Sequence, residues 1–92
     1  MKSLELKKYG TILTGRPFGV QAFAELKNNL NQEAVQLDFS GVISLGSSFG
    51  EEVIVPIAKN QNNEIKIKGA ISPVKACVTL IAFDFNIKVD FI

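Results

Sequence analysis

The stretch Leu37–Glu52, LDFSGVISLGSSFGEE, decides the fold of this chain. It begins as a short apolar strand that ends at Asp38, and it then passes through small residues to Ser48. Ser48 and Glu51 form an S-x-x-E pattern, which is typical of a capping box, so we predict that a helix begins at this serine. An inner face for this helix is indicated by apolar residues at helical spacing, namely Phe49, Val53 and Ile57.

The predicted position of Ser48 at a helix start has an electrostatic consequence. The N-terminus of a helix carries about half a positive charge and unpaired N–H donors, so a negative group is favoured there. That group could be a bound anion or a phosphate on Ser48 or on its neighbour Ser47. Two interpretations stay open: Ser48 is only a cap, or it is a regulatory residue that a partner modifies or contacts.

Strands and helices are expected to alternate on both sides of this stretch. Residues 3–7, 34–39, 64–68 and 87–91 have the period-two pattern of strands, and residues 9–13 extend the first strand or form a hairpin with it. Helices are expected over residues 16–31, 48–57 and 72–85, with Pro56 causing a kink or an early end near Val55. The order β-α-β-α-β-α-β predicts a single α/β domain over residues 1–92, with helices packed on a mixed sheet that contains parallel pairs.

Two of the expected faces can be assigned to residues. The first helix should turn Phe23, Leu26 and Leu30 toward the sheet, because these residues share one helical stripe. The second strand should be central, because Val35, Leu37 and Phe39 share one apolar face. Cys77 lies in a helical apolar pattern and is expected to be a buried small residue.

The composition excludes several function classes. Among 92 residues there are ten Lys and Arg, nine Asp and Glu, no histidine and one cysteine. Catalytic sites that need histidine, zinc sites of Cys and His, and internal disulfides are therefore excluded, and we expect no enzymatic activity and no cofactor. The balanced charge gives no reason to expect nucleic acid or an anionic membrane as a partner. With no apolar leader at its start, the chain is expected to be cytoplasmic.

The central stretch resembles the signature of STAS domains, the fold of anti-sigma-factor antagonists and of sulphate-transporter tails. It is most similar to a small STAS-like family of unknown function, whose members show a Gly-x-Arg-like element before the first helix and an LDF-x-GV...SF-x-[DE]E stretch. The matching residues here are Gly15, Arg16, Leu37–Phe39, Gly41, Val42, Ser48, Phe49, Glu51 and Glu52. The likeness extends from about Leu13 to Phe85.

The resemblance implies a regulatory, non-enzymatic module that binds another protein. In the antagonists, a partner kinase phosphorylates the serine at this helix start, which corresponds to Ser48 here, and Gly46 stands where they usually carry an aspartate. A phosphate on Ser48 would compete with Glu51 for the first N–H groups of the helix and would repel it. The partner implied by the resemblance is a histidine-kinase-type ATPase or an anti-sigma-like protein.

The residues expected to contact a partner or ligand are Arg16, Asp38, Gly46, Phe49, Glu51 and Glu52. For each charged one a structural alternative stays open: Asp38 could orient the Ser47–Ser48 turn or satisfy its own loop, and Arg16 could bind an anion or be solvated. Glu51 and Glu52 point about 100° apart on a helix, which favours solvated first-turn anions over an acid/base pair. The alternative function is a small-molecule or nucleotide-binding module. The last strand, over residues 87–92, is a candidate for pairing between two chains in a homodimer.

Overall fold

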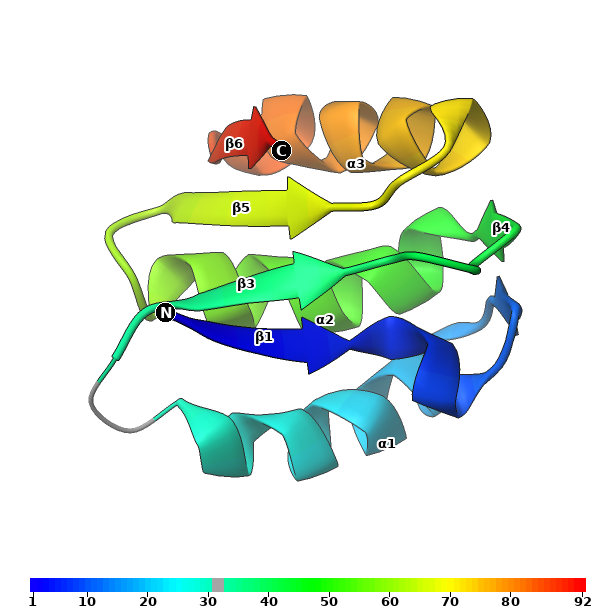
Figure 1. Ribbon diagram of the computed structural model, residues 1–92, viewed down its shortest axis with the longest axis horizontal. Helices are drawn as coiled ribbons and strands as arrows, with labels where there is room; N and C mark the ends of the chain where they lie inside the picture. Colours follow the sequence, from blue (N-terminus) through cyan, green and yellow to red (C-terminus); the bar gives the residue numbers. More distant parts are fainter. Residues whose placement is uncertain (31–32) are drawn as a thin grey trace.

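The computed structural model describes residues 1–30 and 33–92, which form two layers, a sheet and a set of helices (Figure 1). The strands of the main sheet are β1 (Lys2–Glu5), β3 (Val35–Asp38), β5 (Glu64–Lys68) and β6 (Lys88–Phe91). The helices are α1 (Arg16–Leu26), α2 (Ser47–Lys59) and α3 (Ser72–Phe85), with short 3-10 segments η1 (Leu6–Tyr9) and η2 (Lys27–Asn29). The α/β class and the alternation of strands and helices are confirmed.

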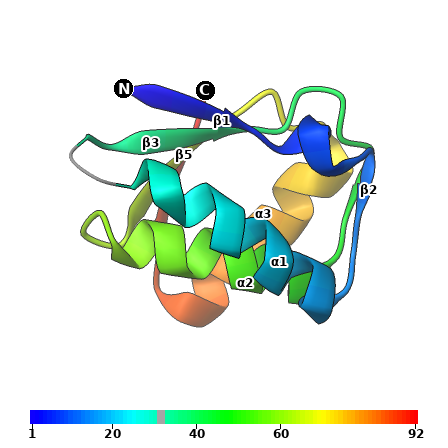
Figure 2. The same ribbon diagram turned by 90° about the horizontal axis from the view of Figure 1, so that it is seen from below.

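The main sheet has the order β1-β3-β5-β6. Every strand pairing among the described residues is parallel, so the expected mixed sheet is wrong in this respect. Each connection between neighbouring strands contains a helix. Such a helical crossover brings the chain back to the starting end of the sheet, so the next strand runs parallel to the one before it. Because successive crossovers move the same way across the sheet with the same hand, all three helices lie on one face, as Figure 2 shows.

The two faces of the sheet therefore differ in character. Alternate residues such as Leu4, Leu37 and Ile67 point toward the helices and are buried. The residues between them form the polar face of the sheet, which no helix covers; in register they include Gln36 beside Lys66 and Asp38 beside Lys68. This clean alternation explains why the sequence showed period-two strands rather than the continuous apolar runs of a sheet buried on both faces.

A second, two-stranded sheet brings the starts of two helices together. In it β2 (Ile12–Leu13) pairs in parallel with β4 (Ser44–Leu45). The expected extension or hairpin at residues 9–13 is thus wrong, because these residues pair with a distant segment of the chain. The ladder continues by one bond, from the Gly46 N–H to the Leu13 carbonyl at 2.8 Å. Consequently α1 and α2 both begin at this small sheet.

The first helix is shorter than expected. The α-helical part ends at Leu26 and continues as η2, and the predicted end at Asn31 lies outside the described residues. Leu26 is buried as expected, while Phe23 and Leu30 are only partly buried against the core. Gly19 and Ala22, which lie outside the predicted stripe, are buried. Of these two, Gly19 lies directly against α2.

Gly19 marks a close approach between the two helices. A Cβ atom at this position would lie 2.9 Å from the Phe49 carbonyl oxygen, 3.0 Å from the Phe49 Cα and 2.9 Å from the Glu52 Cβ. Two of these atoms are backbone and cannot move without shifting α2. The helices can therefore pack at this distance only because residue 19 has no side chain.

The second helix continues past its proline. An early end near Val55 is wrong, because α2 runs to Lys59 with Pro56 inside it. The residues after the proline, Ile57 and Ala58, have no exposed area. Their burial stabilises the last turn against the loss of one backbone hydrogen bond at Pro56.

The third helix begins at Ser72 and ends at Phe85, as predicted. Asn86 adopts the left-handed conformation (φ 59°) and ends the helix, and the following N–H of Ile87 bonds the Ala82 carbonyl at 2.9 Å. Cys77 is half-buried rather than buried, because it lies at the side of α3 and not on the stripe that faces the sheet.

We predict that Gly19→Ala destabilises the protein by about 1–2 kcal/mol, since overpacking against backbone outweighs the gain in helix propensity. Gly50→Ala is the matched control, because the close contact of a Cβ there is with the end of the flexible Ile81 side chain and not with backbone. Urea unfolding of both variants checks the difference. Equal stabilities of the two variants would show that the α1–α2 distance does not depend on Gly19.

Candidate functional site at the start of α2

The start of α2 is not built as a capping box. The helix begins at Ser47, and its N-cap is Gly46, which has an extended backbone (φ −87°, ψ 147°) and no side-chain cap bond. The prediction that Ser48 is the cap is wrong, because the bond from Gly46 to Leu13 in the small sheet fixes the preceding backbone and starts the helix before Ser48 is reached. Ser48 is thus the second helical residue, and the first N–H groups of α2 carry no side-chain cap.

Glu51 and Glu52 are instead bound by an arginine from α1. One guanidinium nitrogen of Arg16 donates to Glu52 Oε2 at 2.5 Å, and the other donates to Glu51 Oε1 at 3.2 Å. Arg16 is the first residue of α1, and its side chain is 50% exposed. One guanidinium therefore joins the first turn of α1 to two consecutive residues of α2. The sequence placed these three residues in one candidate site, but it did not predict that they contact one another.

The serines lie beside this ion pair. Ser48 precedes Glu51 and Glu52 by three and four residues, so the three side chains are neighbours on one face of α2. Ser48 is half-buried and Ser47 is exposed. We call the group formed by Arg16, Ser47, Ser48, Glu51 and Glu52 the α2 tip.

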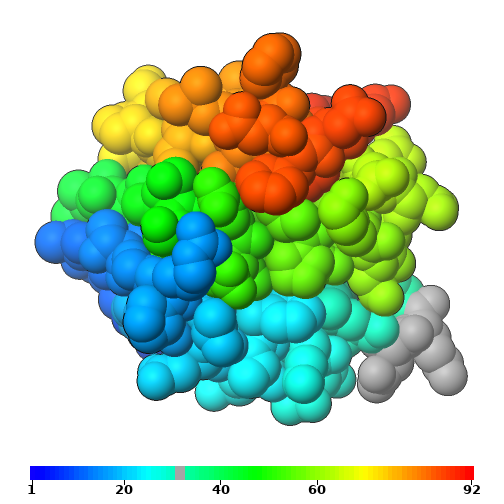
Figure 3. Space-filling view, turned by 180° about the vertical axis from the view of Figure 1, so that it is seen from behind, coloured from blue at the N-terminus to red at the C-terminus, as the bar shows by residue number. Residues whose placement is uncertain are grey.

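In the space-filling view of the helical side, α1, α2 and α3 lie side by side (Figure 3).

The electrostatics of the α2 tip follow from these contacts. Hydrogen bonds to Glu52 and then to Glu51 raise the pKa of Arg16 above its ordinary value, so the guanidinium stays charged. The charge of Glu51 also acts on Cys77 of α3. Burial, and secondly the charge of Glu51, raise the pKa of the Cys77 thiol. Glu51 is therefore bound by Arg16, and its charge also influences the thiol of α3.

Asp38 lies on the other side of the sheet from the α2 tip. It shares the polar face of β3 with Gln36, while α2 packs against the opposite face. One carboxylate oxygen accepts the Ser40 N–H at 2.8 Å. The structure thus supports the alternative that Asp38 satisfies its own loop, and it does not bring this residue to the Ser47–Ser48 turn.

Phe49 and Gly46 are structural residues in this site. Phe49 has no exposed area, and its ring packs edge-on against Phe18 of α1 with centroids 5.2 Å apart. The expected partner contact by Phe49 is therefore wrong, since a partner cannot reach a buried ring. Gly46 lies against Thr14, with a Cβ at position 46 placed 3.1 Å from the threonine methyl. Both residues hold the starts of α1 and α2 together.

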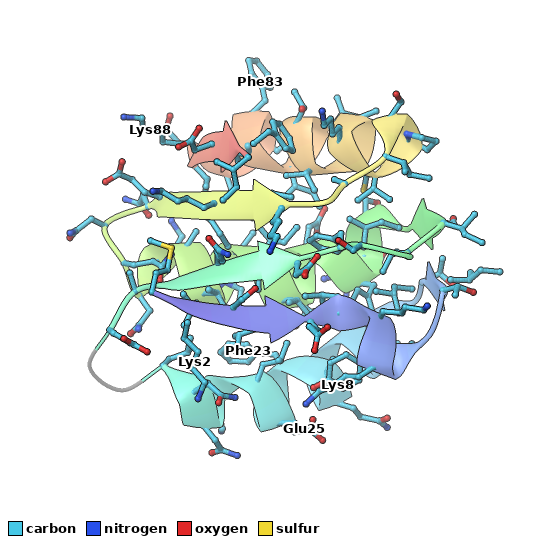
Figure 4. The ribbon with its side chains drawn as sticks, in the orientation of Figure 1. Lys2, Lys8, Phe23, Glu25, Phe83 and Lys88 are labelled. Carbon is cyan, nitrogen blue, oxygen red and sulfur yellow. The ribbon has the colours of Figure 1, made fainter. Side chains whose placement is uncertain are left out.

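A second polar cluster was missed in the sequence. Glu25 of α1 accepts the Tyr9 hydroxyl at 2.7 Å and pairs with the Lys8 ammonium at 2.8 Å (Figure 4). The hydrogen bond from Lys8 lowers the pKa of Glu25, with a smaller effect from Tyr9. This cluster holds the C-terminal end of α1 against η1. Glu25 lies sixteen residues from Tyr9 in the sequence, so no spacing pattern links them and only the fold reveals this cluster.

Other kinds of site find little support in the described part of the chain. No group of three or more Asp, Glu, His or Cys side chains is placed to hold a metal among residues 1–30 and 33–92. Within the same residues, no helix has the length and apolar character needed to cross a membrane. A cavity of about 310 Å³ is lined by residues at the amino ends of β3, β5 and β6, including Ala34, Gln61 and Lys66. It lies at the opposite end of the sheet from the α2 tip.

Comparison with known proteins assigns the chain to a family. Residues 19–75, more than half of the chain, match the family described as a STAS-like domain of unknown function. The chain therefore belongs to this STAS-like family, and the resemblance seen in the sequence is confirmed. No curated protein and no solved structure matches it. The match covers α2 entirely and most of α1, so the elements that form the α2 tip are those of the family, while Arg16 precedes the matched range.

We predict that Glu51→Gln lowers the pKa of Cys77, because it removes the carboxylate charge that raises this pKa. Alkylation of the thiol, followed as a function of pH, should then proceed at lower pH than in the unaltered protein. Glu52→Gln is the control, since Glu52 does not contribute to the shift of Cys77. If both variants alkylated with the same pH profile, the charge of Glu51 would not raise the pKa of Cys77.

We predict that Asp38 titrates below its ordinary pKa of 3.8. Hydrogen bonding by the Ser40 side chain, then by its backbone N–H, and the charge of Lys68 lower this pKa against the opposing effect of burial. A depressed folded-state pKa stabilises the protein above pH 3.8, and this contribution is lost as pH falls through the folded-state value. Carboxyl NMR titration of Asp38, alone and with Ser40→Ala, checks this: the pKa should rise in the variant, and an unchanged value would contradict the assigned cause.

Proposed function

We propose that this STAS-like domain is a non-enzymatic regulatory module that binds another protein through the α2 tip, in the manner of an anti-sigma-factor antagonist. The proposal is supported by one observation above all. A single arginine from α1 holds two carboxylates of α2 beside two serines, one exposed and one half-buried. Ion pairs of this kind at a surface add little to stability, so their arrangement at a helix start favours recognition over structure.

The two serines beside this ion pair suit a switch by phosphorylation. A phosphate on Ser48 would not compete with Glu51 for the first N–H groups of α2, because the Glu51 carboxylate binds Arg16 instead. A phosphate on Ser48 would meet uncapped N–H donors, a favourable helix dipole and Arg16 within the same face. We propose Ser48 as the phosphoacceptor, with Ser47 as the second candidate.

The charge of the α2 tip would change strongly on modification. Arg16, Glu51 and Glu52 together carry a net charge of −1, and a phosphate adds about −1.5 to −2. The phosphate would also compete with Glu51 and Glu52 for Arg16. If the phosphate binds Arg16, these two carboxylates lose their ion-pair partner. Partner contacts made by this surface would then be weakened or replaced, while the buried Phe49 keeps the helix in place.

The proposed partner is a histidine-kinase-type ATPase or an anti-sigma-like protein. This choice is supported by the family resemblance, since the antagonists bind kinases of that type. The α2 tip would contact the partner, with the exposed Val20 on α1, one turn beyond Arg16, as an apolar neighbour.

We predict that incubation with ATP, Mg²⁺ and a histidine-kinase-type ATPase adds one phosphoryl group, detected by intact mass. Peptide mapping should place it on Ser48, and Ser48→Ala should abolish it. Titration calorimetry of the two forms with the ATPase should show that phosphorylation changes the affinity at least tenfold, equivalent to about 1.4 kcal/mol.

The controls separate modification from binding. Asp38→Asn alters the polar face of the sheet and should leave binding unchanged, whereas Arg16→Gln should weaken it. If a complex forms without any phosphorylation, the proposal that the domain binds a partner stands and the proposal of a phosphorylation switch is contradicted. No complex in any nucleotide state would contradict the proposed function.

A further inference from the structure

Among residues 1–30 and 33–92 the sheet ends at β6, and no strand of this part of the chain pairs with the outer side of β6. On its inner side, the Lys88 N–H donates to the Asn63 carbonyl at 2.8 Å, and the Ile92 N–H donates to the Ile67 carbonyl at 2.9 Å. In a parallel ladder, alternate residues direct both backbone groups to the same neighbour. The N–H and C=O groups of Val89 and Phe91 therefore point away from β5, toward the open edge.

The sequence of β6 is self-complementary about Val89. If two β6 strands pair antiparallel with Val89 opposite Val89, Lys88 of each copy lies opposite Asp90 of the other. Val89 then forms the hydrogen-bonded type of pair, which suits the outward direction of its backbone groups. The flanking Phe91 N–H meets the outward carbonyl of Ile87 in the second copy. One register thus satisfies both the charges and the edge hydrogen bonds.

The neighbouring strand extends this charge pattern. Within one copy, Glu64 of β5 lies opposite Lys88, and Lys66 lies opposite Asp90. Across the joined edge, the polar face would read Lys66, Asp90, then Lys88 and Glu64 of the second copy. The signs alternate along the whole row, so no like charges are brought together. The other edge strand, β1, has the sequence KSLE and offers no such symmetric pair.

An apolar stripe lies on the same side of the molecule. Leu80 and Phe83 of α3 are 65% and 85% exposed and are three residues apart, on the side of the helix that faces away from the core. Phe83 points away from the body of the molecule beyond the β6 edge, on the side where Lys88 also lies (Figure 4). Two-fold pairing of β6 would bring two copies of α3 side by side, with these stripes facing each other.

We propose that β6 and the outer stripe of α3 form the interface of a homodimer, in which the two sheets join through antiparallel pairing centred on Val89. The occupant of this edge is a second copy of the same chain, because the alternating charges and the central Val89 are complementary to themselves. This surface is distinct from the α2 tip, so the proposal does not depend on the proposed function.

Sedimentation equilibrium of the purified chain tests the proposal. The apparent mass should rise from 10.0 kDa toward twice this value as concentration increases to about 1 mM. Lys88→Asp and Asp90→Lys each place like charges opposite each other at both symmetry-related positions, so each should weaken self-association at least tenfold. Phe83→Ser should weaken it through loss of the apolar contact. Circular dichroism establishes that each variant is folded.

A mixture of variants distinguishes the specific interface from general effects. Lys88→Asp mixed with Asp90→Lys should restore association, because every contact then joins a carboxylate to an ammonium. Glu5→Lys carries the same net charge as Asp90→Lys but alters β1, and it should not associate with Lys88→Asp in this way. A chain that stays at 10.0 kDa at all concentrations, or variants that do not associate when mixed, would overturn the proposal.

Discussion

The α2 tip depends on one steric constraint, the close approach of α1 and α2 at Gly19. Because residue 19 has no side chain, the backbone of α1 lies against the Phe49 backbone and the Glu52 Cβ. This distance lets Arg16, one turn before Gly19, reach both Glu51 and Glu52. The small sheet of β2 and β4 sets the same geometry from the other end, since both helices start from it. The close packing of α1 on α2 and the ion pairs of Arg16 therefore both depend on the contact at Gly19.

The arrangement of crossovers explains the rest of the surface. A parallel sheet with all its helices on one side leaves a polar face and two edges, and natural proteins usually protect such edges. At β6 the charged residues Lys88 and Asp90 are placed symmetrically about Val89, which protects against unrelated strands and remains compatible with an identical one. The α2 tip and the β6 edge lie on different elements, so a dimer would present two copies of the α2 tip.

Much of this fold could be predicted from periodicity. The alternation of strand and helix, the start of α3 at Ser72 and the central position of β3 follow from local patterns. Other features depend on contacts between distant residues. The pairing of β2 with β4 has too few residues to leave a pattern, and it alone moves the start of α2 from Ser48 to Ser47. The continuation of α2 past Pro56 likewise depends on burial of Ile57, which local propensity does not contain.

The candidate site shows the same division. The motif and the family resemblance identified Arg16, Ser48, Glu51 and Glu52 as a group, and the structure brings their elements together. The sequence could not indicate that the carboxylates bind Arg16 instead of the helix N-terminus, because capping and ion pairing compete for the same oxygens and geometry decides between them. Asp38 was included because it is near in sequence, although the sheet separates it from α2.

The central claim is that Arg16 exchanges carboxylates for phosphate when Ser48 is modified. The most direct measurement is an NMR spectrum of the Arg16 guanidinium in protein carrying phosphoserine at position 48, introduced by semisynthesis. The account predicts shifted guanidinium resonances with a coupling to phosphorus, together with changes in the carboxyl signals of Glu51 and Glu52. An Arg16 spectrum identical to that of the unmodified protein would contradict it.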